Sequence, residues 1–477
     1  MANVPFLGGA YEGRSSNVAP QTCINYFYES GEDWESLVTT PGSTVFNNSF
    51  SGPVRGGIEY NGKAYFVIGP TLYEFDSVGN GVAMGTLNTT TGQVSMAHNG
   101  ARDGAVQQIM ILDGTTGHIF DNTTKALSPI TDTDMVASSI CAFYDGYFVY
   151  TQDNSDRFWI TNLYDGTAIT GTDFFTAEGD PDEVVTIVVD QRQVFVFGKK
   201  TLEMWYNSGD IDQTLQRFQG GYYQFGCAAR HSAKRFDNSV IWLSENERGN
   251  AQVMRIDGGT ATVVSPPEVN YQLSQYTTIS DATAYVYQDE GHEFYVLTFP
   301  TEGATWVYDA KEKAWHQRAH SINGVFPNRE RYSCHVFAFN KHLVGDFENG
   351  TIYQLDTSVG TIDGARIERE RTTSPWAIQE ARVRISSVQL DMDEGIGNSN
   401  DANDADFWLS YSKDGGHHFS PEHAQSAGDE GEYANRVVWR RLGHARNWIF
   451  RLRTFTPHSH VLKGLIARPW GFSEGAT

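Results

Sequence analysis

Over its first three quarters the chain repeats one pattern of hydrophobic and polar positions seven times. In each copy an apolar or aromatic run precedes a short turn of Gly, Asn or charged residues, and a second run follows that usually ends at Asp or Asn. The paired runs are 64–68 with 72–75, 109–112 with 118–120, 147–150 with 158–162, 194–197 with 202–207, 240–243 with 253–257, 294–299 with 305–309, and 343–346 with 351–356. Short runs rich in β-branched and aromatic residues, without a helical period, predict β-strands.

The spacing of the copies predicts their arrangement. Their closing Asp or Asn residues lie 41 to 52 residues apart, which is close to the roughly 40–50 residues of a propeller blade. Most copies have another strand-like run upstream, joined by turns such as Asn61-Gly62 and Asp145-Gly146 that favour tight hairpins. A ring of small sheets buries their faces and leaves only short edges exposed. We therefore predict an all-β protein with a seven-bladed β-propeller over residues 1–361, whose N-terminal segment is a candidate to complete one blade.

The pattern changes after residue 361. A charged stretch at 366–371 is followed by five strand-like runs, at 381–392, 407–411, 436–439, 448–454 and 461–467. Several of them alternate polar and apolar residues, which predicts strands with one buried face. We predict a C-terminal β-sandwich docking domain over residues 362–477. Between its strands we expect two polar loops, 393–406 and 421–433, and after them a tail at 469–477.

Charge and cysteine usage narrow the functional classes. The chain has 35 basic and 58 acidic residues and a formal net charge of −23, which disfavours broad binding of nucleic-acid phosphates. Its four cysteines are far apart and lack metal-site spacing, which predicts core thiols in a reducing compartment. No apolar run approaches 18 residues and the N-terminus lacks the pattern of a signal peptide. We therefore expect neither a cleaved secretion signal nor a membrane-spanning segment.

Several acidic groups are candidates for chemistry. The loop from Asp393 to Asp406 carries carboxylates that could gather around calcium, but it lacks the spacing of an EF-hand, and a solvated loop is favoured. Asp180 with Asp182 and Glu183, and Glu32 with Asp33 and Glu35, could in principle serve as glycosidase carboxylates. The sequence motifs of nucleophile elbows, zinc proteases and phosphate-binding loops are missing from the sequence. We expect no enzymatic activity, no cofactor and no metal.

The segment Ser412–Phe419 reads SKDGGHHF and fits S-x-D-x-G-x-x-F, which resembles the Asp-box hairpin of sialidases and other β proteins. In such a hairpin the Asp accepts hydrogen bonds from backbone amides of the turn and the Phe anchors it to the core. One copy outside the repeats predicts a hairpin and no activity.

A dense cluster of arginines lies near the C-terminus of this acidic chain, and it contains two tryptophans. Three interpretations compete: a solvated strand face with acidic partners across the strands, a docking surface for an acidic partner or a neighbouring subunit, and direct contact with DNA, which the net charge opposes. The candidate docking residues are Arg436, Trp439, Arg440, Arg441, Arg446, Trp448, Arg451 and Arg453.

Seven segments together resemble one known family, the packaged-DNA stabilisation or tail hub proteins of short-tailed bacteriophages similar to the Salmonella podophages. The segments are CINYF at 23–27, TPG at 40–42, VRGGIEYN at 54–61, GQVSMAH at 92–98, WITNL at 159–163, RVVWRRLG at 436–443 and FRLR at 450–453. They are collinear and span nearly the whole chain. The longer 393–406 loop and the 469–477 tail depart from the family, so contacts made there do not transfer.

The resemblance implies a structural protein of the virion, assembled in the cytoplasm of the host bacterium. It implies a homo-oligomeric ring of six copies below the portal and its adaptor. This ring closes the channel after packaging, retains the DNA, and carries tailspikes or tail fibres and the needle or plug. DNA passes through it without sequence-specific binding. The alternatives from other classes are a virion-attached propeller glycosidase or depolymerase, and a carbohydrate-binding propeller. An enzyme of this kind should place Asp, Glu or Tyr groups at the centre of the propeller.

Overall fold

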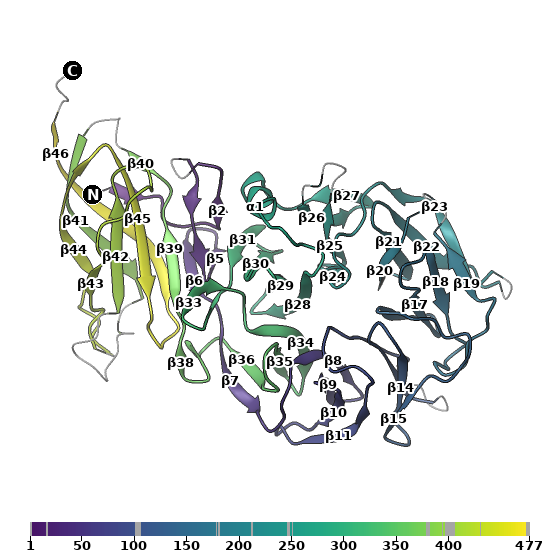
Figure 1. Ribbon diagram of the computed structural model, residues 1–477. Coiled ribbons are helices and arrows are strands. Elements are labelled where there is room, and N and C mark those ends of the chain that lie inside the picture. The colour runs from purple at the N-terminus through teal and green to yellow at the C-terminus, as the bar shows by residue number, and fades with distance from the viewer. Residues whose placement is uncertain are drawn as a thin grey trace.

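The computed structural model consists almost entirely of β-strands (Figure 1). It describes residues 2–15, 18–100, 106–177, 179, 182–210, 213–245, 249, 251–377, 382–393, 395, 406–429 and 431–473. The all-β class predicted from the alternation of short apolar runs is confirmed. A ring of small sheets occupies the right of the view, and two larger sheets face each other on the left.

Seven antiparallel sheets of four strands build the ring, of which five are separate and two are parts of larger sheets. The first sheet consists of β8 (Val54–Tyr60), β9 (Lys63–Ile68), β10 (Thr71–Phe75) and β11 (Gly81–Thr86), and the second of β12 (Ser95–His98), β13 (Gln108–Leu112), β14 (Gly117–Asp121) and β15 (Ala126–Pro129). The third consists of β16 (Cys141–Tyr144), β17 (Tyr147–Thr151), β18 (Arg157–Ile160) and β19 (Phe174–Thr176), and the fourth of β20 (Val184–Asp190), β21 (Gln193–Gly198), β22 (Leu202–Asn207) and β23 (Leu215–Tyr223). The others are β24 (Lys234–Phe236), β25 (Ser239–Glu245), β26 (Ala251–Asp257) and β27 (Thr260–Val263); β28 (Thr283–Asp289), β29 (His292–Phe299), β30 (Ala304–Asp309) and β31 (Ala314–Gln317); and β34 (Tyr332–Ala338), β35 (Lys341–Asp346) and β36 (Ile352–Asp356) with β7 (Gly42–Asn47). The repeated run pairs of the sequence coincide with the second and third strands in chain order of the first six sheets. In the last sheet they coincide with β35 and β36, which follow β7 and β34 in the chain.

The sheets close into a propeller through their first strands. Each of β8, β12, β16, β20, β24 and β28 packs against the first strand of the next sheet, and β34 packs back against β8. Within the sheets, short hairpins connect neighbouring strands. Asn61 and Gly62 have φ of 51° and 72°, and Asp145 and Gly146 have φ of 45° and 97°. These left-handed conformations suit the tight turns that the two dipeptides predicted.

The last sheet of the ring takes its outer strand from the N-terminal region. Strand β7 pairs antiparallel with β36, with Ser43 opposite Leu355, so residues distant in sequence tie the ring together. Gly42 allows this close approach, because a Cβ added there would lie 2.4 Å from the carbonyl oxygens of Val359 and Thr361. A larger residue at this position would push β7 away from the chain that follows β36.

The two facing sheets form the sandwich. One has the order β44 (Val438–Ala445), β41 (Arg382–Met392), β46 (Val461–Ser473), β6 (Glu35–Thr39) and β5 (Tyr26–Ser30), with β1 (Ala2–Val4) paired to β46. The other continues from β31 through β4 (Cys23–Ile24), β39 (Arg369–Thr372), β45 (Asn447–Thr454), β42 (Phe407–Ser412) and β43 (His423–Gln425), with β40 (Trp376–Ala377) paired to β45. Phe407, Leu409 and Leu465 are buried between them. Because both sheets include N-terminal strands, residues 2–39 belong to the sandwich as much as to the ring.

The remaining elements are small. They are β2 (Tyr11–Glu12), β3 (Pro20–Gln21), α1 (Pro267–Leu273), β32 (His320–Ile322), β33 (Val325–Asn328), β37 (Thr361–Ile362) and β38 (Ala365–Arg366). The repeats showed no helical period, and α1 is a seven-residue turn of helix with proline in its first turn. Within the described ranges, no helix has the length and hydrophobicity to span a bilayer.

Two expectations for the sandwich need correction, and a third falls largely outside the described residues. The predicted loop at 421–433 contains β43, whose backbone pairs with β42 although its three side chains are exposed. The predicted tail begins as strand, because β46 continues to Ser473, opposite Arg382 of β41. Residues 474–477 and most of the loop between Asp393 and Asp406 lie outside the described residues.

Candidate functional site

The two tryptophans of the candidate docking set lie in the sandwich core. Trp439 and Trp448 are 2 % and 1 % exposed, and the Trp439 indole donates to the carbonyl of His423 at 2.6 Å. Alternation along the strands explains their burial, because Trp448, Phe450 and Leu452 share the inward face of β45. Neither tryptophan is therefore available to a partner.

The arginines of β45 have carboxylate partners within the chain. Arg453 donates to Glu368 and to Glu422, the latter at 2.6 Å. These partners raise the pKa of Arg453 and hold it charged. Arg451 lies 3.7 Å from Glu370 and covers the ring of Phe419 at 3.7 Å from its centroid. The arginines of β45 therefore pair with acidic side chains of the same chain, as the interpretation of a solvated strand face with acidic partners predicts.

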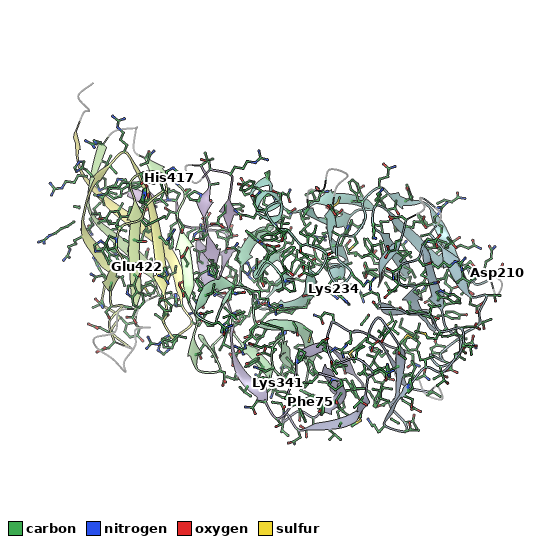
Figure 2. All side chains as sticks on the ribbon, in the orientation of Figure 1. Phe75, Asp210, Lys234, Lys341, His417 and Glu422 are labelled. Atoms are coloured by element: carbon green, nitrogen blue, oxygen red, sulfur yellow. The ribbon has the colours of Figure 1, made fainter. Side chains whose placement is uncertain are left out.

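Arg440 and Arg441 of β44 lie on the other sheet and are exposed, as are Arg436 before this strand and Arg446 after it. Ser387 of β41 pairs with Arg440 on one side and with Arg468 of β46 on the other, so these arginines flank one serine across three strands. We call six exposed arginines on these strands and on the turn after β44 the basic face: Arg382, Arg384, Arg440, Arg441, Arg446 and Arg468. Nitrogen-tipped side chains project from this side of the sandwich in Figure 2.

Three members of the basic face were not among the sequence candidates. Arg382 and Arg384 belong to β41 and Arg468 to β46, far from the cluster in sequence. The alternation Arg382-Val383-Arg384-Ile385 already placed the two arginines on one face, but it did not reveal that β44 is the neighbour of β41. Arg441 adopts φ of 65°, and this irregularity lets Arg440 and Arg441 both face solvent.

The Asp-box segment forms the predicted hairpin. Asp414 accepts hydrogen bonds from the Ser412 hydroxyl at 2.7 Å and from the His418 amide at 3.0 Å. These bonds, and one to the His418 ring, lower the pKa of Asp414. Phe419 is only half-buried and is covered by the Arg451 guanidinium, not by the core. The motif orders a turn on the sandwich.

The acidic candidates do not converge. Asp182 is buried and accepts the amide of Thr201 at 3.1 Å, Glu183 pairs with Lys199, and Asp180 lies outside the described residues. Glu32 and Glu35 are exposed at the β5–β6 turn. Among the residues that the structure describes, no three His, Cys, Asp or Glu side chains gather as a metal site would require. The four cysteines are free, and Cys334 is the least buried.

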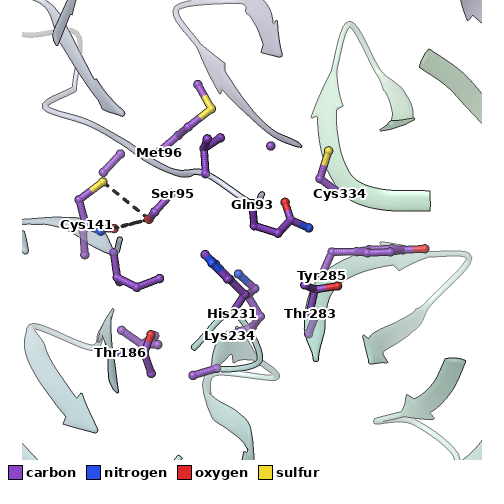
Figure 3. A pocket seen from close by; sticks show the side chains of 18 of the residues that line it. Gln93, Ser95, Met96, Cys141, Thr186, His231, Lys234, Thr283, Tyr285 and Cys334 are labelled. Carbon is purple, nitrogen blue, oxygen red and sulfur yellow. Dashed lines mark hydrogen bonds between the residues drawn. The ribbon is translucent and has the colours of Figure 1, made fainter. Parts of the chain in front are cut away.

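A cavity of about 550 Å³ lies where the first strands of the seven sheets meet (Figure 3). The described lining includes Tyr285 but no Asp or Glu. The Tyr285 hydroxyl donates to Glu330 at 2.7 Å, and both side chains are buried. The carboxylates that a glycosidase would need are therefore not brought to this cavity by the described residues.

Comparison with known families agrees with this arrangement. A profile described as the β-propeller of bacteriophage P22 Gp10 matches residues 2–360, and one described as its β-sandwich matches residues 368–469. The chain belongs to the P22 Gp10 family. The resemblance to packaged-DNA stabilisation proteins is confirmed, and so is a propeller followed by a sandwich. As a family member the chain is a phage structural protein that acts in DNA stabilisation.

Other comparisons add little to the family assignment. No curated protein matches the chain. Among solved structures, PorZ of Porphyromonas gingivalis is 9% identical, covering 74% of this chain and 44% of its own, with a TM-score of 0.38. The chain thus spans less than half of PorZ. A chain of the mitotic checkpoint complex (8% identity, 65% and 94% coverage, TM-score 0.40) and the N-terminal domain of Nup159 (9%, 70% and 99%, TM-score 0.41) also match. Similarities this weak support no functional argument.

Proposed function

We propose that this P22 Gp10 family protein is the tail hub of a short-tailed phage. As a ring of six copies, it would close the channel below the portal and adaptor, retain the packaged DNA, and anchor tailspikes or fibres and the needle or plug. Family membership over both the propeller and the sandwich is the observation that carries the proposal. The net charge of −23 fits a wall that does not grip passing DNA.

The basic face is the part of the chain best suited to hold neighbouring copies together. Within the described ranges no ion pair joins Arg440, Arg441, Arg446 or Arg468 to a carboxylate. An arginine-rich sheet face in an acidic protein favours an acidic partner surface, since complementary charge guides association and suppresses wrong partners. Arginine is also enriched among the residues that dominate binding energy at interfaces. The proposal keeps the docking role that the sequence indicated, but it assigns this role to the surface of β41, β44 and β46 instead of to β45 and the tryptophans.

A matching acidic surface lies at the other end of the same sheet. The β5–β6 turn exposes Glu32, Asp33 and Glu35 around Trp34, which is 51% exposed. A tryptophan ring among carboxylates suits arginines, which can pair with the carboxylates and stack on the ring. If the basic face of one copy docks on this turn of the next, the contact is head-to-tail, and such contacts generate closed rings when the rotation permits.

Mass measurement of the purified full chain, with and without the portal adaptor, tests the assembly. We expect a closed oligomer, and a mostly monomeric R440E/R441E variant. Adding E32K, D33K and E35K should restore association. K199E/K200E, which reverses two exposed propeller lysines, is the matched control and should assemble normally. A wild-type chain that stays monomeric and does not bind adaptor or fibre would overturn the hub.

Particles that lack the chain provide the test of DNA retention. We expect them to lose packaged DNA to added nuclease, and addition of the purified chain to filled heads should restore protection. Equal protection with and without the chain would contradict the proposal. Cleavage of host polysaccharide by the purified chain would support the glycosidase alternative.

A further inference from the structure

The central cavity of the propeller has an unusual charge for this chain. Its charged lining residues are Arg230, Lys234 and Arg235, and the described lining contains no carboxylate. Arg230 pairs with Asp153 at 3.2 Å and Arg235 with Asp190 at 2.9 Å, and neither aspartate is among the lining residues. Two of the three cations are thereby balanced from outside the cavity. In a chain with 58 acidic and 35 basic residues, this lining is opposite in charge to the chain as a whole.

Lys234 is the cation left over. It lies on β24, the first strand of its sheet, and is partly buried. Within the described part of the chain it makes no hydrogen bond or ion pair; the groups that act on it are the thiols of Cys334 and Cys227, at a distance. Burial lowers the pKa of Lys234. A partly buried ammonium group without an ion-pair partner is less favourable than a paired one, so a bound anion would stabilise this position.

Hydrogen-bonding groups surround Lys234 from several blades. His231 has its pKa lowered to about 3 by burial and by Lys234 and Arg230, so its neutral ring can donate one hydrogen bond. Gln93, in the segment before β12, donates to the Ser333 carbonyl at 3.3 Å and keeps a second N–H, and Thr283 of β28 lines the same cavity. Figure 3 shows His231, Lys234, Gln93 and Thr283 around the cavity. Hydrogen-bond donors from separate segments beside one cation suit an oxyanion.

We propose that the propeller cavity binds a phosphate group, with Lys234 as its counter-ion and His231 and Gln93 as donors. The cavity volume of about 550 Å³ is in the usual range for small-ligand sites, roughly 300–1,000 Å³, and is too small for a length of nucleic acid. The phosphate can be free or carried by a mononucleotide. This site goes beyond the proposed hub function and does not depend on it.

Titration with inorganic phosphate tests the site in the full-length protein. Binding is followed by ³¹P NMR line broadening and by the melting temperature, against sodium chloride of equal ionic strength. We expect saturable binding to the wild type and at least tenfold weaker binding to K234M. Without phosphate, K234M should melt at the same temperature as the wild type or higher, because the unpaired ammonium is gone. Adenosine monophosphate in a second titration distinguishes a nucleotide from the free ion.

The control separates this site from general effects of phosphate. Phosphate raises the stability of many proteins by exclusion from their surfaces, but that effect is equal in K234M and in K199M, whose lysine is exposed. If K234M does not fold, K234Q replaces it. Binding of either probe that is lost in the Lys234 variant and kept in K199M supports the proposal. Equal binding by wild type and variant, or no binding of either probe, overturns it.

Discussion

The N-terminal strap, residues 2–15, depends on one buried arginine of the sandwich. Arg371 of β39 is fully buried, and its guanidinium donates to the carbonyls of Phe6 at 2.7 Å, Gly9 at 2.9 Å and Thr22 at 3.0 Å. Burial lowers the pKa of Arg371. We predict that Arg371→Met, which keeps most of the volume and removes the donors, releases the strap from the sandwich.

The magnitude follows from the carbonyls that lose their donor. Thr22 keeps a second donor, the amide of Thr372 at 3.2 Å, so the loss falls on Phe6 and Gly9. An unsatisfied buried group costs about 1–3 kcal/mol, and relief of the buried charge offsets part of the sum. We therefore expect a loss of about 3 kcal/mol in the free energy of unfolding.

Urea unfolding and hydrogen exchange measure the two parts of this prediction. The urea midpoint should fall. Relative to the wild type, amides of the strap and of β4 should exchange faster, while those of β20–β22, which lie far from Arg371, should not change. Lys199→Met, at an exposed propeller lysine, is the control and should leave both unchanged. An unchanged midpoint together with wild-type protection of the strap would refute the reasoning.

Three further predictions concern other buried contacts, at Gly9, Glu330 and His460. Gly9→Ala places a Cβ 2.6 Å from the Trp315 carbonyl oxygen and should lower the free energy of unfolding by about 1–3 kcal/mol; an unchanged urea midpoint would mean that the strap can shift freely. Glu330→Gln leaves the buried Arg318 without its carboxylate and should lower the free energy of unfolding by about 3 kcal/mol. An unchanged urea midpoint would show that Arg318 has another counter-ion. Burial lowers the pKa of His460 to about 3, so its contribution to stability is present above about pH 6.5 and is lost as the pH falls toward 3. His460→Gln should therefore reduce the slope of stability against pH between 6 and 4 by up to about 1.4 kcal/mol per unit, and parallel slopes would show that His460 is not buried neutral.

The repeats of the propeller could be predicted because their signals are local. A run, a turn of defined conformation and a second run lie within about 20 residues, and the left-handed Asn61-Gly62 and Asp145-Gly146 turns are encoded by the residues themselves. Strand β7 carries no such signal. Its pairing of Ser43 with Leu355 depends on the ring having closed, so the sequence indicated only that an N-terminal segment was a candidate.

The arginine cluster shows where sequence proximity misleads. Arg440 and Arg453 are close in sequence, yet β44 and β45 belong to different sheets of the sandwich, so one faces solvent and the other pairs with Glu368 and Glu422. The alternation of side chains along a strand does predict the burial of Trp448, because it places this residue on the same face as Phe450 and Leu452. The propeller cavity had no sequence signature, because each strand contributes only a few residues to it.

Shared strands argue that the ring and the sandwich form one cooperative unit. Strand β7 completes the last sheet of the ring, while β5 and β6, immediately before it, extend a sheet of the sandwich. Strand β4 joins β31 of the ring to β39 of the sandwich within one continuous sheet. Neither part can satisfy its edge strands until residues 23–47 are in place, so we expect neither to be stable when expressed without them. The change of pattern near residue 361 therefore marks a change of architecture along the chain, while the folding unit spans both sides of it.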